Sequence, residues 1–146
     1  MDKLKNLTVV ALCLGIVFSI TFCTRKASAE VLAIVSLSLQ EMNVVIDGTP
    51  TYTWKVSTGR KGHETPPGTF EPDWLHEDHY TSLYDDAPMP HSVFFNGHIA
   101  VHGTDAEHKL GKVDSHGCIR LSRKNAKIFF QLVQKHKMVN TTITVE

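Results

Sequence analysis

The residue types best suited to covalent chemistry gather around Cys118. His116 precedes it by two residues and His102 by sixteen, and a glycine directly follows each of these histidines. The thiolate is the reactive form of cysteine, and a histidine within hydrogen-bond reach can take the thiol proton. Glycine beside the nucleophile lets the backbone come close to an acyl group. The pattern therefore predicts a cysteine nucleophile that works with a histidine base in acyl transfer.

Each residue near Cys118 has an expected role. His102 is the expected proton donor and acceptor, because the pKa of an imidazole lies near neutrality. His116 is expected to support the site, by lining it, by holding the loop or by helping to bind an oxyanion. The backbone N–H groups of Gly117 and Cys118 lie in a glycine-containing turn before an expected helix, so they are the expected oxyanion donors. Arg120 carries a planar fork that fits a substrate carboxylate, and a structural ion pair is an equal alternative.

The nine histidines of the chain make zinc an alternative to weigh. His98 and His102 share one face of an expected strand, and Cys118 could add a thiolate. Structural zinc usually has paired ligands such as Cys-x-x-Cys, which the sequence lacks, and catalytic zinc needs three protein ligands. We therefore expect no metal and no other cofactor. The remaining histidines are expected on the surface or in loops: His63, His76, His79, His91, His108 and His136.

Short strands are expected on both sides of these residues. Alternating apolar residues and β-branched or aromatic runs predict strands over residues 31–39, 42–46, 51–56, 92–95, 98–102 and 141–145. Two hairpin turns are expected, at Asp47-Gly48 and at Asn96-Gly97. Residues 73–90 have no clean period and contain aromatic, acidic and proline residues. That segment is expected to be a lid or a wall of the substrate site, and a plain surface excursion is the alternative.

One clear helix is expected directly after the cysteine motif. Ser122 is a suitable N-cap, and apolar residues follow at helical spacing, namely Ala126, Phe129, Phe130 and Val133. Many strands with a single main helix predict a β-rich α+β domain. The length of 146 residues is enough for one domain, and 42% hydrophobic residues are ordinary for a globular protein. The net formal charge is zero, so we expect no attraction to nucleic acid or to an anionic membrane.

The first 29 residues have the layout of a secretory signal peptide. Lys3 and Lys5 form a positive head, residues 7–22 are almost continuously apolar, and small residues occupy positions 27–29. We expect cleavage after Ala29 and export to the periplasm or cell envelope, with no stable membrane association afterwards. The catalytic domain is then expected to span residues 30–146.

An uncleaved membrane anchor is the alternative for this segment. The apolar run of 16 residues is short for a spanning helix of roughly 20, whereas Arg25 and Lys26 after the run argue against cleavage. A lipoprotein with its lipid on Cys23 is disfavoured, because bulky Phe22 precedes that cysteine. After cleavage Cys118 would be the remaining cysteine of the chain, and a lone cysteine in an oxidising compartment is a candidate reactive thiol.

The motif around Cys118 resembles a known family. Residues 102–104 (His-Gly-Thr) followed by residues 115–121 (Ser-His-Gly-Cys-Ile-Arg-Leu) resemble the signature of the L,D-transpeptidase catalytic domain of bacterial cell-wall enzymes. Residues 56–59 and 65–70 look like two further landmarks of that domain in the same order. The resemblance covers nearly everything after residue 30. Pro67 departs from the family, which often has a small or polar residue there.

The resemblance implies a β-sandwich-like catalytic domain and an enzyme of cell-wall biogenesis. Its cysteine, here Cys118, would attack the carbonyl that follows an L-configured centre in a peptidoglycan stem peptide. A terminal D-amino acid would leave, and an amine acceptor would resolve the thioester into a cross-link. His102 would move the protons, with its second ring nitrogen oriented by the backbone carbonyl of Gly103. Peptidoglycan stem peptides are therefore the expected partners, and carbapenems the expected covalent inhibitors.

Two other functions stay open at this point. An L,D-carboxypeptidase or another hydrolase on the same scaffold would share every catalytic residue and would pass the thioester to water. A non-enzymatic wall-binding module belongs to a different class, and it would have no need for Cys118 and His102.

Overall fold

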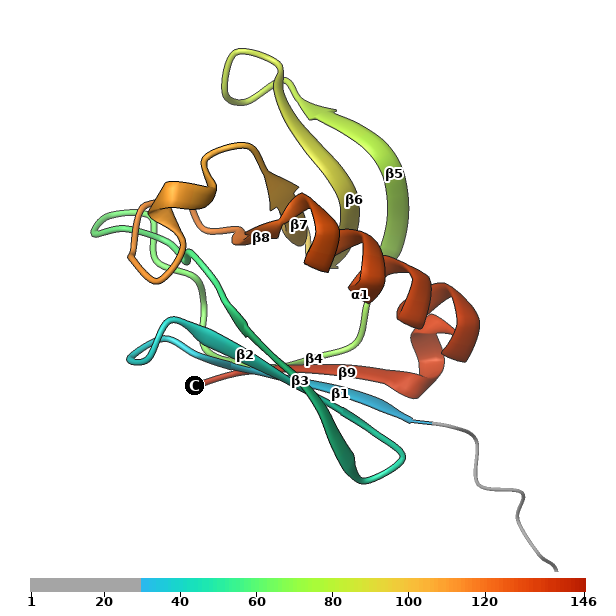
Figure 1. Cartoon of the computed structure of the whole chain (residues 1–146). Helices are drawn as coiled ribbons and strands as arrows, with labels where there is room; N and C mark the ends of the chain where they lie inside the picture. Colours follow the sequence, from blue (N-terminus) through green and yellow to red (C-terminus); the bar gives the residue numbers. More distant parts are fainter. Residues whose placement is uncertain (1–29) are drawn as a thin grey trace, which may run out of the picture.

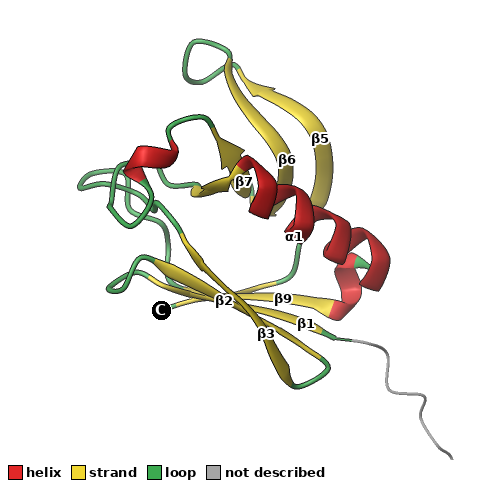
Figure 2. Cartoon of the chain, viewed as in Figure 1, coloured by secondary structure: helices red, strands yellow, loops and turns green. Residues whose placement is uncertain are grey.

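The computed structural model describes residues 30–146, so the expected signal peptide over residues 1–29 lies outside the described residues. The described chain forms two β-sheets and one main helix (Figures 1 and 2). The first sheet has the strand order β3-β2-β1-β9-β4, with strands β1 (Val31–Ser36), β2 (Glu41–Ile46), β3 (Thr49–Lys55), β4 (Gly68–Phe70) and β9 (Thr141–Val145). The second sheet has the order β5-β6-β7-β8, with strands β5 (Trp74–Thr81), β6 (Ala87–Asn96), β7 (Ile99–Thr104) and β8 (Ile119–Ser122). The expected β-rich α+β architecture is confirmed.

The first sheet forms where the sequence alternates apolar and polar residues. Every second residue of β1 is buried, beginning with Val31. β1 pairs with β2 in antiparallel and with β9 in parallel orientation. The turn between β2 and β3 consists of Asp47 and Gly48, with φ angles of 50° and 76°. Two left-handed residues match the twist of a tight hairpin, so this expected turn is confirmed.

The helix α1 (Arg123–His136) follows β8 without a loop. Its N-cap is Ser122, whose hydroxyl accepts a hydrogen bond from the Asn125 N–H at 3.2 Å. The helix buries its four expected apolar residues, Ala126, Phe129, Phe130 and Val133. It packs against β6, β7, β8 and β1, so one apolar core joins the helix to both sheets. The helix thereby fixes the position of the second sheet, whose strands hold the site.

The two faces of the second sheet have different environments. On one face Val93, Val101 and Ile119 lie side by side and belong to the main core under α1. One residue earlier or later on the same strands, the side chains point to the other face. That face carries Phe94 and Ala100 in a small apolar cluster, with Cys118 packed against it. The sheet therefore presents the cysteine on the face opposite the helix.

The segment over residues 73–90 is a long hairpin arm and not an irregular loop. β5 pairs with β6 from Trp74↔Phe94 to Thr81↔Ala87, and the arm projects beyond the rest of the sheet (Figure 1). β7 pairs with only the end of β6, so the first half of β6 has one unpaired edge. Pro88 and Pro90 lie in this half, where the missing N–H of a proline breaks no hydrogen bond to a neighbouring strand. His91, with φ of 55°, interrupts the pairing. Because of the prolines and this interruption, the sequence of the segment does not show the alternating pattern of a regular strand.

Smaller differences concern strand ends. The first strand ends at Ser36, because residues 37–40 form a turn. The second expected turn is displaced by one residue, since Asn96 pairs with Ile99 and the linking residues are Gly97 and His98. A register shift between Phe94 and Asn96 produces this displacement. The described residues include no helix that is long and apolar enough to span a membrane.

Candidate active site

Parallel pairing of β7 with β8 brings the two halves of the motif together. His102 lies opposite Arg120 in the register, and Cys118 directly precedes β8. Cys118 is therefore beside Ala100, and His102 is two residues further along the same strand face. Both side chains line a cavity of about 350 Å³. Two residues that are sixteen positions apart in sequence thus lie on neighbouring strands of one sheet.

His102 is held as a neutral base. It is only 6% exposed, and its Nδ1 lies 2.8 Å from the carbonyl oxygen of Gly103. That carbonyl can only accept, so the proton of the neutral ring sits on Nδ1 and Nε2 is free to accept another. Burial lowers the pKa of His102 to about 4, although the hydrogen bond to Gly103 acts in the opposite direction. The geometry agrees with the roles expected of His102 and of the Gly103 carbonyl.

Gly103 also has a steric reason to be glycine. A Cβ at this position would lie 3.1 Å from Cγ of Pro90 and 3.2 Å from Cα of Arg123. Any side chain would push β7 away from the hairpin arm or from the start of α1. The carbonyl that orients His102 is thus placed by close backbone packing on both sides.

Cys118 is a protonated thiol at rest. Burial is the main influence and raises its pKa, while the Ala100 N–H and Arg120 act in the opposite direction. Its Sγ lies 3.7 Å from the carbonyl oxygen of His98, to which the thiol can donate. A thiol of raised pKa beside an imidazole of lowered pKa forms an uncharged pair. The thiol proton must then move to His102 as the sulfur attacks.

Two buried hydroxyls hold the turn that contains the cysteine. Ser115 Oγ donates to the carbonyl of Cys118 at 2.5 Å and accepts from the Gly117 N–H at 3.1 Å. Thr65 Oγ1 donates to the carbonyl of Gly117 at 2.7 Å and accepts from the Gly59 N–H at 2.9 Å. Gly117 has φ of 116°, which favours glycine. Every polar backbone group of Gly117 is therefore engaged.

This turn changes the expected oxyanion donors. Gly117 was expected to offer its N–H to the oxyanion, but Ser115 already accepts that hydrogen bond. The Cys118 N–H is the donor that we retain for this role. Gly117 instead supplies the left-handed backbone that presents Cys118 to the cavity.

His116 packs among other side chains at the cavity wall. Its Nε2 lies 2.5 Å from Nη2 of Arg60, its Nδ1 lies 3.3 Å from Nη1 of the same residue, and Tyr84 stacks on the ring at 4.2 Å. The ring of His63 meets it edge-on at 4.9 Å. Burial and the positive charge of Arg60 lower the pKa of His116, so its ring stays neutral. His116 thus forms part of the cavity wall and links the turn that contains Cys118 to the hairpin arm, and its supporting role stays a prediction.

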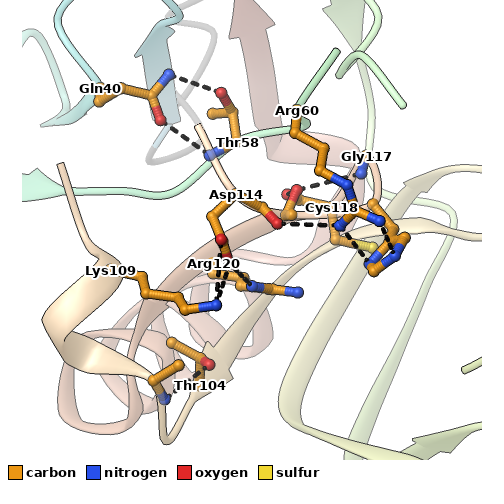
Figure 3. A network of polar contacts seen from close by, with 12 residues as sticks. Gln40, Thr58, Arg60, Thr104, Lys109, Asp114, Gly117, Cys118 and Arg120 are labelled. Carbon is orange, nitrogen blue, oxygen red and sulfur yellow. Dashed lines mark hydrogen bonds and ion pairs between the residues drawn. The ribbon is translucent and has the colours of Figure 1, made fainter. Parts of the chain in front are cut away.

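Arg120 forms the ion pair that the sequence left as one of two roles. Its Nη1 lies 3.0 Å from Oδ2 of Asp114, and Lys109 Nζ lies 3.0 Å from the same oxygen (Figure 3). The hydrogen bond from Lys109 is the main cause of the lowered pKa of Asp114. Arg120 also lines the cavity, so a role toward a substrate carboxylate stays a prediction.

Polar residues that the sequence did not identify support the turn that contains Cys118. Gln40 donates to Thr58 Oγ1 at 2.6 Å and accepts from the Thr58 N–H at 2.9 Å. The Thr58 carbonyl then accepts from the N–H groups of Asp114 and Ser115. No sequence signal pointed to Gln40, because its contact is eighteen residues away in the chain. Thr58 and Thr65 did lie in the two landmarks that resemble the family, but the sequence does not show which groups they bind.

The cavity extends to the tip of the hairpin arm. Its lining includes Thr81, Leu83, Tyr84 and Met89 from that arm. Residues 73–90 therefore do form a wall of the candidate site, as one of the two alternatives for this segment predicted. Over residues 30–146, no three His, Cys, Asp or Glu side chains gather closely enough to hold a metal ion.

Comparison with known proteins agrees with this geometry. Residues 30–145 match the family model of the L,D-transpeptidase catalytic domain. An L,D-transpeptidase from Mycobacterium smegmatis is similar in structure, with a TM-score of 0.73, 26% identity, and coverage of 81% of this chain and 59% of that one. One from Stackebrandtia nassauensis has a TM-score of 0.71, 24% identity, and coverage of 88% and 61%.

A third similar structure is L,D-transpeptidase 3 from Mycobacterium tuberculosis in complex with a faropenem-derived adduct, with a TM-score of 0.71, 22% identity, and coverage of 81% and 60%. The chain thus spans about three fifths of the length of these solved structures. No curated protein matches the sequence. Because the family match extends over nearly all described residues, the chain belongs to the L,D-transpeptidase catalytic domain family.

Proposed function

We propose that the protein is an exported cysteine acyltransferase that cross-links peptidoglycan stem peptides through a thioester on Cys118. The observation that carries this proposal is the uncharged pair of Cys118 and His102 on one cavity wall, with His102 fixed by Gly103. Membership of the L,D-transpeptidase family supports an enzyme of this class. The substrate follows from the family name, and the proton chemistry follows from these residues.

The first half-reaction forms the thioester. His102 Nε2 takes the thiol proton while the sulfur of Cys118 attacks the carbonyl carbon, and the Cys118 N–H stabilises the resulting oxyanion. The tetrahedral intermediate collapses, the carbon–nitrogen bond breaks, and His102 returns the proton to the departing amine of the terminal D-amino acid. The acyl group stays on the sulfur.

The second half-reaction releases the acyl group. The amine of a second stem peptide attacks the thioester, and His102 takes a proton from that amine. Collapse of the second tetrahedral intermediate breaks the carbon–sulfur bond and returns the proton to the leaving sulfur. A cross-linked peptide and the original thiol result. If water replaces the amine, the product is a trimmed stem peptide, which is the hydrolase alternative.

Because His102 is buried, its ring becomes positively charged only during the reaction. A pKa of about 4 makes the imidazolium unfavourable in the free enzyme. The positive charge forms together with the negative oxyanion and is stabilised by it at close range in a water-poor site. The Gly103 carbonyl stabilises the same imidazolium through Nδ1.

We also propose that the N-terminal segment directs export, with Glu30 as the first residue of the mature protein. The basis is the arrangement of Lys3, Lys5, the apolar run over residues 7–22 and the small residues before position 30. N-terminal sequencing of protein from the cell envelope tests this. An intact Met1 in mature material would instead establish an anchor.

A defined substrate tests the proposed activity. Incubation with a purified disaccharide tetrapeptide, followed by mass spectrometry, should yield a cross-linked dimer with loss of one D-amino acid. Cys118→Ala should abolish turnover and preserve the fold, since one small side chain replaces another. A tripeptide without dimer would favour the hydrolase, and wild-type turnover by Cys118→Ala would overturn the mechanism.

A further inference from the structure

The arm strand β5 carries an aromatic cluster that the proposed reaction does not use. Trp74 stacks on Phe94 with ring centroids 3.9 Å apart and planes 3° apart, although the indole side chain is 40% exposed. His76 and His79 stand nearly perpendicular to the indole, at 6.0 Å and 5.6 Å. We name Trp74, His76, His79 and Phe94 the aromatic shelf.

One face of the indole is open. Phe94 covers the inner face of Trp74. His79 lies 5.0 Å from Phe94 and 5.6 Å from Trp74, so it stands beside the stacked pair and not on top of the indole. The outer face of Trp74 is therefore a flat apolar surface with imidazole nitrogens at its rim. An exposed aromatic ring that is held rigid from behind is well placed to stack on a ligand.

The aromatic shelf is continuous with the nucleophile. Trp74 pairs with Phe94, Phe94 pairs with Ala100, and Ala100 lies beside Cys118, all on the sheet face opposite α1. This path crosses three strand spacings, or about 14 Å. The shelf thus lies one short peptide away from the reacting sulfur.

We propose that the aromatic shelf binds an amino sugar of the glycan to which the donor stem peptide is attached. This inference rests on the proposed function. In a stem tetrapeptide the attacked carbonyl belongs to the third residue, and three residues plus the link to the sugar span roughly 13 Å when extended. That length matches the distance from Cys118 to Trp74. The apolar C–H face of a pyranose fits the open indole, and the imidazoles offer partners for hydroxyl and N-acetyl groups.

The neutral imidazole of His79 suits this ligand. Burial lowers the pKa of His79, so at neutral pH its ring has one donor and one acceptor nitrogen. Uncharged donors and acceptors match the uncharged groups of an N-acetylated sugar. The arrangement gives the shelf affinity for a saccharide independent of the peptide.

A matched pair of substrates tests the inference. The ratio of the KM for the free tetrapeptide to the KM for the disaccharide tetrapeptide should be about ten in the wild type, equivalent to ~1.4 kcal/mol of saccharide binding. Trp74→Leu still covers Phe94 but removes the flat face, so the ratio should fall to about one. Trp74→Tyr, which retains an aromatic face, should keep most of the tenfold ratio of KM values. Tyr80→Ala is the control, because Tyr80 is an exposed aromatic that follows His79 and so points to the other face.

A binding measurement separates the shelf from the reaction. Chitotetraose is titrated into the Cys118→Ala protein and followed by tryptophan emission, which comes from exposed Trp74 and buried Trp54. The expected result is a saturable change that is lost in Trp74→Leu and kept in Trp74→Tyr and Tyr80→Ala. Equal KM values in the wild type, or unaltered binding in Trp74→Leu, would overturn the shelf. Wild-type protein that converts neither peptide but binds chitotetraose would overturn the proposed function and leave the shelf standing.

Discussion

The uncharged resting state of Cys118 and His102 determines how the thiol should react. Burial raises the pKa of the thiol and lowers that of the imidazole to about 4, so neither group is charged at neutral pH. Reactivity of Cys118 then depends on proton transfer to His102 and not on a standing thiolate. The carbonyl of Gly103 matters because it keeps Nε2 free of a proton.

Replacement of His102 should therefore slow the thiol itself. We expect His102→Ala to lower the rate of Cys118 alkylation by iodoacetamide near pH 7, and turnover to fall roughly a hundredfold to ten-thousandfold. His116→Ala is the matched control, because His116 stacks on Tyr84 at the cavity wall and should affect alkylation less. Equal alkylation of His102→Ala and wild type would show that His102 does not activate the thiol. The opposite ranking of the two variants would exchange their roles.

The loop after β3 supports the turn that contains Cys118, and within this loop the backbone at Gly59 lies very close to the backbone of residues 63–65. A Cβ at Gly59 would lie 1.9 Å from the carbonyl oxygen of His63 and 2.6 Å from the Thr65 nitrogen. Both neighbours are backbone and cannot move independently of the loop. Thr65 in turn binds the carbonyl of Gly117, so displacement of the loop would disturb the turn before Cys118.

We expect Gly59→Ala to lower both stability and Cys118 reactivity. The steric conflict should cost at least about 1 to 3 kcal/mol in the free energy of unfolding, measured by urea denaturation, and alkylation of Cys118 should slow. Gly62→Ala is the control, since nothing lies within 4 Å of its Cβ and only its φ of 83° opposes the change. That variant should lose about 1 kcal/mol or somewhat more and keep its alkylation rate. Wild-type reactivity in Gly59→Ala would refute a positioning role for this loop.

Regular elements were predictable because their signals are local. The strand alternation of β1, the Asp47-Gly48 turn and the helix after Ser122 each depend on neighbouring residues, and all three are confirmed. The hairpin arm was not recognisable, because Pro88 and Pro90 disfavour a strand unless one of its edges is free. Whether a strand has a free edge depends on the arrangement of the whole sheet and cannot be read from a short stretch of sequence.

The pairing of Cys118 with His102 was predictable for a different reason. A cysteine nucleophile needs a base such as histidine, and the resemblance to the family motif identified His102, sixteen positions before Cys118, as that base. The support from Gln40 to Thr58 and from Thr65 to Gly117 was not predictable, since polar contacts between distant loops follow no spacing rule. The hydrogen bond from the Gly117 N–H to Ser115 was not predictable either, because it depends on the shape of the folded turn.

The whole fold should become less stable as the pH falls because it buries a neutral histidine. The pKa of His102 is about 4 in the folded protein and 6.5 as its unperturbed value. Between these values the unfolded chain binds the proton and the folded chain does not, so stability decreases as pH falls from above 6.5 toward 4. His116 and His79 also have lowered pKa values and act in the same direction.

Denaturation at two pH values measures this effect. Between pH 7 and pH 4.5, His102 should account for a loss of about 2 to 3 kcal/mol in the free energy of unfolding. His102→Gln should reduce that loss without removing it, because His116 and His79 remain. An identical pH dependence in the variant and in the wild type would show that His102 is not held neutral by the fold.

The proposed function requires that Cys118 forms an acyl-enzyme. A strained lactam carbonyl is an electrophile that Cys118 should attack with help from His102 and the Cys118 N–H. We therefore expect a carbapenem to acylate this protein.

Intact-mass spectrometry after incubation with imipenem is the most direct measurement. The predicted result is one covalent adduct per chain that is absent in Cys118→Ala and unaffected by a metal chelator. Iodoacetamide labelling of the same sample shows whether the thiol is accessible. Labelling by iodoacetamide without any imipenem adduct would mean a reachable cysteine that lacks acyl-transfer machinery, and it would contradict the proposed transpeptidase function.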